Sequence, residues 1–180
     1  MSPLPPWRYF PSYAVPPSWV DPVIHVFADS WHEIDSTTRH DRDFKPGCVR
    51  RVIAPGLAAL GFAVEESKKQ AGVLPCPVLI GDQGESLITY ELDALDAVRG
   101  IAVEVEVSHA TVGSVIHRDL IQASLIPDVR FLAVAAPIEC RCGTSATTEP
   151  TYEKGCALLE TIYGSPPLIL PFEGVLLIGY

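Results

Sequence analysis

The chain has few basic residues and no long apolar run, and both absences limit what it can be. Its 180 residues include 13 Lys and Arg against 22 Asp and Glu, a formal net charge of -9. This balance counts against nucleic-acid binding, which usually needs a basic surface, although metal ions can neutralise local carboxylates. No apolar run reaches the roughly 18 residues of a bilayer span, and no signal-peptide pattern opens the chain. We therefore expect a cytoplasmic protein with no membrane partner.

Cysteines are also few and irregularly spaced. An odd count without regular spacing does not predict a disulfide framework. Only one residue separates Cys140 from Cys142, which is too short a spacing for the usual zinc knuckle, and the sequence has no second cysteine pair to complete such a site. We expect free and mostly buried thiols at all five positions, which are Cys48, Cys76, Cys140, Cys142 and Cys156.

The hydrophobic content of 48% is that of a globular chain, long enough for one domain with a substantial core. Residues 1–45 form a Pro- and aromatic-rich extension, and we expect residues 1–22 to be extended, without regular structure, and packed on the core. Residues 46–180 form the α/β domain. Its expected order is helix, strands, helix, strand, helix and strand, which predicts a mixed β-sheet flanked by helices.

Several elements can be placed by periodicity. A helical stripe runs from Val49 to Leu60, and Pro55 should kink or split it. Residues 71–83 contain several Pro and Gly residues, which predicts a loop. A second helix shows an apolar face over 112–123, and the apolar strand 129–135 follows it. The passage from Ile101 to Ala135 should then be a right-handed parallel crossover. A helix over 152–163 and a final strand over 175–178 complete the domain.

Carboxylates gather on the predicted hairpin at 89–107. Side chains two apart on a strand share a face, as Glu104 and Glu106 do. A two-residue turn at Arg99-Gly100 would put Asp93 opposite Glu106, so that Asp93, Glu104 and Glu106 converge. Three close carboxylates repel one another unless a cation lies between them, and Mg²⁺ is the simplest such cation. The alternative is a solvated edge hairpin, on which like charges cost little. The apolar flanks favour a central hairpin.

The most basic stretch lies between residues 39 and 51. One interpretation is a strip that contacts phosphates; the other is a solvated loop and helix start. The helix after Glu106 offers a further candidate DNA-binding residue, Arg118. The other interpretation, weighed equally, is that Arg118 is an ordinary exposed helix residue. The candidate DNA-binding residues are Arg39, Arg42, Lys45, Arg50, Arg51 and Arg118.

The order of these motifs resembles the PD-(D/E)xK nuclease superfamily. An acidic residue on one strand, Asp93, is followed by Glu104-Val105-Glu106 on the next, then by a helix and an apolar strand. The superfamily commonly has Lys where this chain has Glu106, and that departure resembles the BglII and BamHI type of restriction endonuclease. The run LDALDAVRGIAVEVEVSHA and the tail TYEKGCALLETIYGSPPLILPFEGVLLIGY extend the likeness from Cys48 to Tyr180.

The resemblance implies a restriction-endonuclease-like fold and a Mg²⁺-dependent, type II site-specific endonuclease acting on double-stranded DNA as a homodimer, with Mn²⁺ as a possible substitute. Asp93 and Glu104 would bind the metal with the Val105 carbonyl, and Glu106 would orient or deprotonate the attacking water, or ligate a second metal. A further acidic residue from the preceding helix is implied but not identified. The alternatives are a non-catalytic regulatory protein that keeps a nuclease-like fold, and an enzyme acting on RNA or a repair intermediate.

Overall fold

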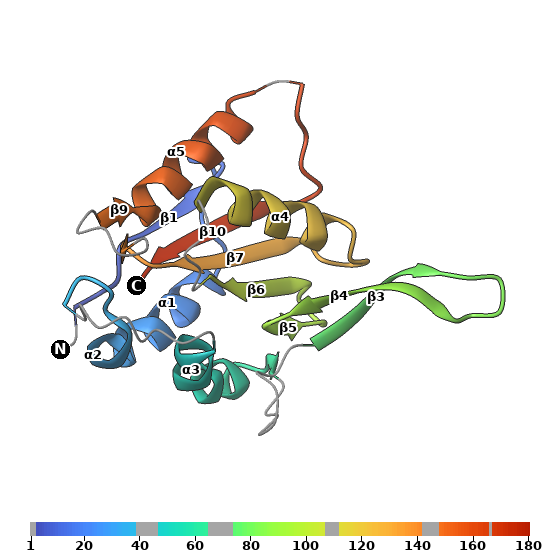
Figure 1. The fold of residues 1–180 in the computed structure, drawn as a ribbon, viewed down its shortest axis with the longest axis horizontal. Helices are drawn as coiled ribbons and strands as arrows, with labels where there is room; N and C mark the ends of the chain where they lie inside the picture. Colours follow the sequence, from blue (N-terminus) through green and yellow to red (C-terminus); the bar gives the residue numbers. More distant parts are fainter. Residues whose placement is uncertain (1–2, 39–46, 65–73, 107–111, 142–147, 166) are drawn as a thin grey trace.

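The computed structural model describes residues 3–38, 47–64, 74–106, 112–141, 148–165 and 167–180. A six-stranded mixed sheet forms the centre, in the order β1-β10-β7-β6-β5-β2. Figure 1 shows helices on both of its faces, which confirms the expected mixed α/β class. The strands of this sheet are β1 (Trp7–Phe10), β2 (Ala63–Val64), β5 (Ala94–Asp96), β6 (Ile101–Val105), β7 (Phe131–Ala136) and β10 (Gly174–Gly179).

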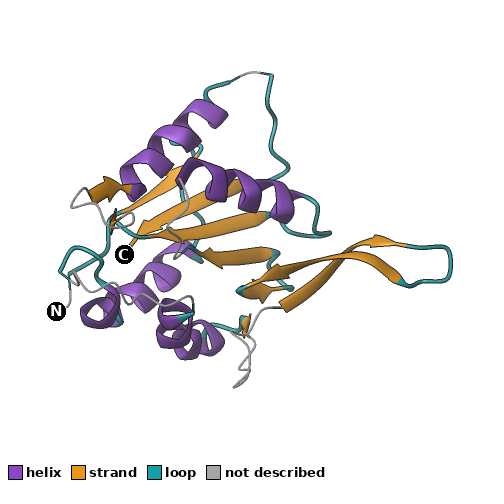
Figure 2. Cartoon of the chain, viewed as in Figure 1, coloured by secondary structure: helices purple, strands orange, loops and turns teal. Residues whose placement is uncertain are grey.

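Two layers of helices cover the sheet (Figure 2). The first packs with the sheet residues Val103 and Val105 and contains α1 (Val20–Asp29), α2 (Trp31–Ile34) and α3 (Cys48–Ala59). The second packs with Ala102 and Leu132 and contains α4 (Val112–Ser124) and α5 (Thr151–Tyr163). Successive residues of a strand point to opposite faces, so β6 contributes to both hydrophobic cores. None of the helices in the described ranges is long and apolar enough to cross a membrane.

The passage β6-α4-β7 brings two parallel strands side by side. Ile101 lies opposite Phe131 and Val105 opposite Ala135, which confirms the parallel pairing expected for this segment. β10 then pairs with β7, also in parallel, so that β6, β7 and β10 end at the same edge of the sheet. Glu106, the residue after β6, therefore lies beside the C-terminal end of β7.

The N-terminal segment is more regular than the sequence predicts. β1 pairs antiparallel with β10, and α1 begins at Val20, so the expectation of an extended segment without regular structure over 1–22 is wrong. Packing of its aromatics is confirmed for Tyr9, Phe10 and Trp19, which are buried, but is wrong for Trp7 and Tyr13, which are exposed. Strand pairing supplies hydrogen bonds that a Pro-rich segment cannot make within itself. The described part of 1–45 thus belongs to the central sheet and its core.

Prolines misled the sequence analysis at two other places. The predicted loop 71–83 contains β3 (Leu74–Ile80), which pairs with β4 (Ser86–Leu92) in a hairpin that projects from the body in Figure 1. A two-stranded ribbon has free edges, where the missing N–H of Pro75 and Pro77 is tolerated. α3 runs unbroken through Pro55. Its buried Ile53 and Leu57 hold it against the core, which offsets the lost helical hydrogen bond.

A short antiparallel pair, β8 (Glu139–Arg141) with β9 (Thr148–Pro150), lies between β7 and α5.

Candidate active site

The turn between β5 and β6 sets which residues of the two strands face each other in the candidate site. Ala94 lies opposite Val103 and Asp96 opposite Ile101, so the connection has four residues, 97–100. The predicted two-residue turn at Arg99-Gly100 is therefore wrong.

The carboxylate of Asp96 explains the longer turn. Its Oδ1 accepts the backbone N–H groups of Val98 at 3.0 Å and Arg99 at 2.9 Å. Gly100 has a φ of 68°, and a Cβ there would lie 2.4 Å from the carbonyl oxygen of Asp128. An aspartate that caps its own turn competes with a tight hairpin, and only glycine fits the fourth position.

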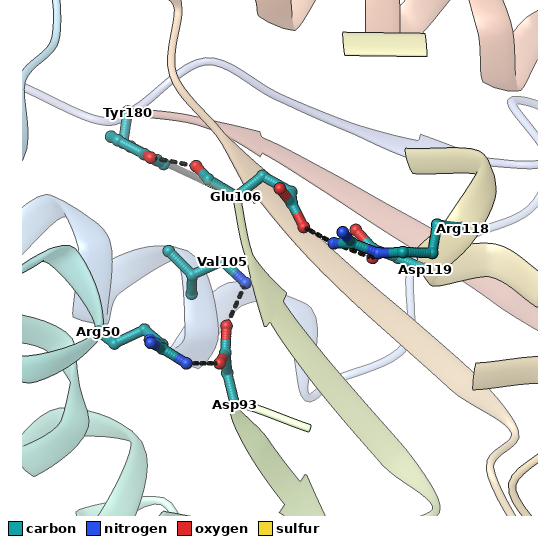
Figure 3. A network of polar contacts seen from close by, with 7 residues as sticks. All are labelled: Arg50, Asp93, Val105, Glu106, Arg118, Asp119 and Tyr180. Carbon is teal, nitrogen blue, oxygen red and sulfur yellow. Dashed lines mark hydrogen bonds and ion pairs between the residues drawn. The ribbon is translucent and has the colours of Figure 1, made fainter. Parts of the chain in front are cut away.

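The shift in register moves Asp93 away from Glu106 and toward Glu104. Asp93 sits in the bend between β4 and β5, and its Oδ2 accepts the backbone N–H of Val105 at 2.7 Å. The predicted pairing of Asp93 with Glu106 is wrong. The observed register of β5 against β6 differs from the predicted one by two residues, so each side chain stays on its predicted face of the sheet. Asp93 still meets the Glu104-Val105-Glu106 segment (Figure 3).

Asp93 is buried and forms an ion pair with Arg50 of α3. Burial raises the pKa of Asp93, while the charge and hydrogen bond of Arg50 and the bond from Val105 oppose that shift. Arg50 is one of the candidate phosphate-contacting residues of the basic stretch. Its observed partner is a carboxylate of the candidate site, so in this state it serves as a counter-ion there.

Glu104 is 9% exposed and forms no hydrogen bond or ion pair with the described residues. Burial is the first cause that raises its pKa to about 10, followed by the charges of Asp93, Asp119 and Glu106. A buried carboxyl near three others stays protonated at neutral pH unless a cation joins it. Glu104 is therefore the group in this cluster that most needs a counter-ion.

Glu106 follows the end of β6 and is fixed through its backbone. Its N–H donates to the Ala135 carbonyl at 2.8 Å, and its own carbonyl accepts the Tyr180 hydroxyl. Its side chain pairs with Arg118 at 2.8 Å. Burial, a hydrogen bond with Asp119 and the charge of Asp119 raise the pKa of Glu106 to about 8, with Arg118 opposing. A carboxyl with that pKa can take up a proton near neutral pH.

The sequence analysis missed Asp119. It lies on α4 and is 1% exposed, with Oδ1 paired to Arg118 at 3.0 Å. A signal was present, because Asp119 is three residues after Ile116 and four before Ala123, both on the buried face of α4. A carboxylate inside an apolar stripe should have been added to the candidate site.

Most of the predicted basic strip cannot be placed against this site. Arg39, Arg42 and Lys45 lie outside the described residues. Arg51 is exposed beside Arg50, and Arg118 is half exposed at the carboxylate cluster. The only predicted DNA-binding residues that the described ranges bring to the candidate site are thus Arg50 and Arg118.

The side chains of the cluster offer the ligand type that a hard divalent cation prefers, but they are not already arranged around one metal position. All of the clustered side chains offer carboxylate oxygen, which is the ligand type of Mg²⁺ and Mn²⁺. In the described ranges, no three His, Cys, Asp or Glu side chains already surround one point. Arg50 and Arg118 pair with three of the four carboxylates, which are Asp93, Glu106 and Asp119. The residues fit a metal once these pairs rearrange.

Neither a family model, nor a curated protein, nor a solved structure matches this chain. The function must therefore be argued from the cluster itself.

Proposed function

We propose that this chain is a divalent-cation-dependent endonuclease that hydrolyses phosphodiester bonds of double-stranded DNA, with Mg²⁺ as its cofactor and Mn²⁺ as a substitute. The observation that carries the proposal is the convergence of Asp93, Glu104, Glu106 and Asp119 at the end of β6, where the described residues supply only two arginines to balance them. Carboxylates are rarely buried unless they are paired, and strongly shifted pKa values cluster at functional sites.

The arrangement of elements supports the restriction-type assignment. An acidic residue precedes β5, the motif Glu104-Val105-Glu106 ends β6, and α4 and parallel β7 follow. This is the order that the resemblance to BglII- and BamHI-type enzymes implies. A site-specific enzyme of that type would act as a homodimer, because two active sites cut the two strands and twofold symmetry matches a palindromic sequence.

Each residue has a distinct role in the proposed mechanism. Asp93 and Glu104 would hold Mg²⁺, with the Val105 carbonyl as a further oxygen ligand. When bound, the metal lowers the pKa of water and neutralises charge on the phosphate. Glu106 would accept a proton from the attacking water, which suits its pKa of about 8. Arg118, half exposed at the same edge, would bind a phosphate oxygen.

The arginine pairs favour a second candidate function. Because Arg50 and Arg118 already neutralise part of the cluster, the fold is consistent with a regulatory protein that keeps a nuclease-like core without catalysis. Calorimetric titration with Mn²⁺ separates the two functions, since the regulatory protein has no need to bind the ion.

Cleavage of DNA is the test of the first proposal. Purified protein is incubated with several phage and plasmid DNAs in Mg²⁺ or Mn²⁺, with EDTA as the control. Discrete fragments that depend on the metal are expected. Intact DNA in every sample, together with no Mn²⁺ binding by calorimetry, would favour the regulatory function.

A further inference from the structure

The hairpin of β3 and β4 projects from the body and carries exposed apolar side chains (Figure 1). Four large ones have exposed fractions from 45% to 63%, and these are Leu79, Ile80, Leu87 and Ile88. In the described ranges, the two strands form a sheet of their own. A two-stranded ribbon by itself is marginally stable in water. This arm, residues 74–92, is therefore a candidate surface for a partner that covers it.

The two edges of the arm differ. Pro75 lies opposite Glu91 and Pro77 opposite Thr89, and a proline has no N–H to give to a neighbouring strand. A strand added beside β3 would lack these two donors. β4 contains no proline, and among the described residues its backbone pairs with no strand other than β3. The outer edge of β4 is thus open to a further strand.

Thr89 presents its backbone to this open edge. In an antiparallel ladder, successive residues point their N–H and C=O alternately toward and away from the partner strand. Pro77 fits a position that does not bond across the pair, since it has no N–H to donate, and its partner there is Thr89. The N–H and C=O of Thr89 therefore point outward, where a strand of another chain can pair with them.

Charge decides which partner fits the arm. Residues 74–98 contain no Lys or Arg, and the turn at the tip carries Asp82 and Glu85. Such a surface repels the phosphates of DNA. Residues 86–90 of β4 are uncharged, so this part of the strand can face a copy of itself without repulsion. The charge pattern favours a second copy of this chain over nucleic acid.

An antiparallel pairing centred on Thr89 suits the side chains. It places Thr89 opposite Thr89 of the second copy, and Ile88 opposite Tyr90. Threonine pairs, and pairs of aromatic with β-branched residues, are favourable across strands. Glu91 then lies opposite Leu87, so the two Glu91 carboxylates stay apart. A twofold axis between the two Thr89 residues makes the contact self-complementary and closed.

We propose that β4 pairs antiparallel with β4 of a second copy, with the two Thr89 residues facing each other, so that the two arms form one four-stranded sheet. This inference rests on the proposed function for the expectation of a homodimer, and it names the surface that joins the two chains. Because each arm projects from its body, the two bodies lie at opposite ends of the shared sheet (Figure 1).

A charge swap at Thr89 tests the pairing in the full chain. Thr89 is exposed, so Thr89→Asp and Thr89→Lys should both fold. Each variant alone places like charges opposite each other and should weaken dimerisation by more than about tenfold. An equimolar mixture of the two should restore the dimer, because Asp then faces Lys. Thr89→Val keeps the backbone and the β-branched shape, so this matched control should dimerise like wild type.

Sedimentation velocity over a concentration series measures the dimer dissociation constants, and circular dichroism confirms that each variant is folded. A monomeric wild type, dimers that persist in both charged variants, or a mixture that stays monomeric overturns the pairing. Opposite effects of Asp and Lys on DNA affinity, with a monomer throughout, would assign the arm to DNA and also overturn it.

The same samples separate this inference from the proposed function. The expected dimer behaviour without metal-dependent cleavage of any DNA supports the pairing and overturns the nuclease function. If a charged variant does not fold, Thr89→Pro decides the question, because it removes the outward N–H without breaking a bond to β3. A monomer is expected for Thr89→Pro, and a dimer as tight as that of wild type overturns the pairing.

Discussion

Arg50 pairs with Asp93 across the boundary between α3 and the central sheet, and Asp93 in turn accepts the N–H of Val105. An arginine that the sequence assigns to a DNA-contacting strip therefore ties the helix layer to the candidate site. Its neighbour Arg51 is exposed and makes no comparable contact among the described residues.

Arg50→Met should destabilise the metal-free protein much more than Arg51→Met. Removing Arg50 leaves Asp93 buried without its counter-ion, which costs about 3 kcal/mol for a broken buried pair. Removing exposed Arg51 should change the free energy of unfolding by about 0.5 kcal/mol or less. Urea denaturation in EDTA measures both. Equal losses would mean that the pair contributes nothing to the fold.

Arg51 remains available for DNA. Neutralising it should lower the salt slope of DNA affinity by about 0.9, the contribution of one phosphate contact. Affinity is measured against salt concentration in Ca²⁺, which replaces Mg²⁺ to limit cleavage. An unchanged slope would assign Arg51 to ordinary solvated surface.

In the metal-free protein, the free energy of unfolding should fall as pH rises. Burial is the main cause that raises the pKa of Glu104 and Glu106 from 4.5 to about 10 and about 8. Groups whose pKa is raised by folding stabilise the protein below the unfolded value, and this stabilisation is lost as pH rises through the folded value. Both groups contribute to the decline from pH 4.5 to about 8, and Glu104 alone continues it to about 10.

Glu104→Gln isolates the larger contribution. It should make the decline shallower by up to about 1.4 kcal/mol per pH unit, the slope for one proton. Urea denaturation in EDTA at a series of pH values gives the slope directly. A steeper or unchanged decline in the variant would contradict the raised pKa of Glu104.

At position 106, Gln should be tolerated better than Lys. A Gln side chain can still accept the hydrogen bond of Arg118 and orient a water molecule, whereas Lys would place an ammonium beside that guanidinium. Cleavage rates of Glu106→Gln and Glu106→Lys in Mn²⁺ compare them. Full activity with Lys and none with Gln would point to the lysine-type mechanism that is common in the superfamily.

Gly100→Ala should cost more stability than Gly84→Ala, although both glycines have positive φ. An added Cβ at Gly84 meets nothing within 4 Å, but at Gly100 it lies 2.4 Å from a backbone oxygen of Asp128. The strain of a positive φ, about 1 kcal/mol, is shared, so the difference reports the clash. Similar melting temperatures for the two variants would show that the turn before β6 is less constrained than described.

Local patterns predicted most of the secondary structure of the second half. The apolar stripe of α4, the strand β7 and the helix α5 have strong periodicity, and their order is enough to predict parallel pairing of β6 with β7. Prolines led to wrong predictions at β3, which was expected to be a loop, and at α3, which was expected to be kinked or split. Free strand edges and tertiary packing tolerate them there, and neither is visible in local sequence.

The site was predicted in part. The alternation of Glu104 and Glu106 identified a face that the register shift preserves, since a shift of two keeps every side chain on its side. The exact partners depended on Asp96 capping its own turn, which requires knowledge of the loop geometry. The roles of Arg50 and Asp119 come from long-range packing of α3 and α4, which spacing along the strands cannot supply.

Metal-dependent cleavage of DNA by wild type, Asp93→Ala, Glu104→Ala and Glu91→Ala is the decisive comparison, made after each variant is shown to be folded. Glu91 is an exposed carboxylate on β4 and serves as the matched control. Loss of Asp93 or Glu104 should lower cleavage by about a hundredfold or more, because a metal ligand supplies several kcal/mol of charge stabilisation. Glu91→Ala should cleave like wild type. Unimpaired cleavage by both Asp93→Ala and Glu104→Ala would contradict the assignment of this cluster as the active site.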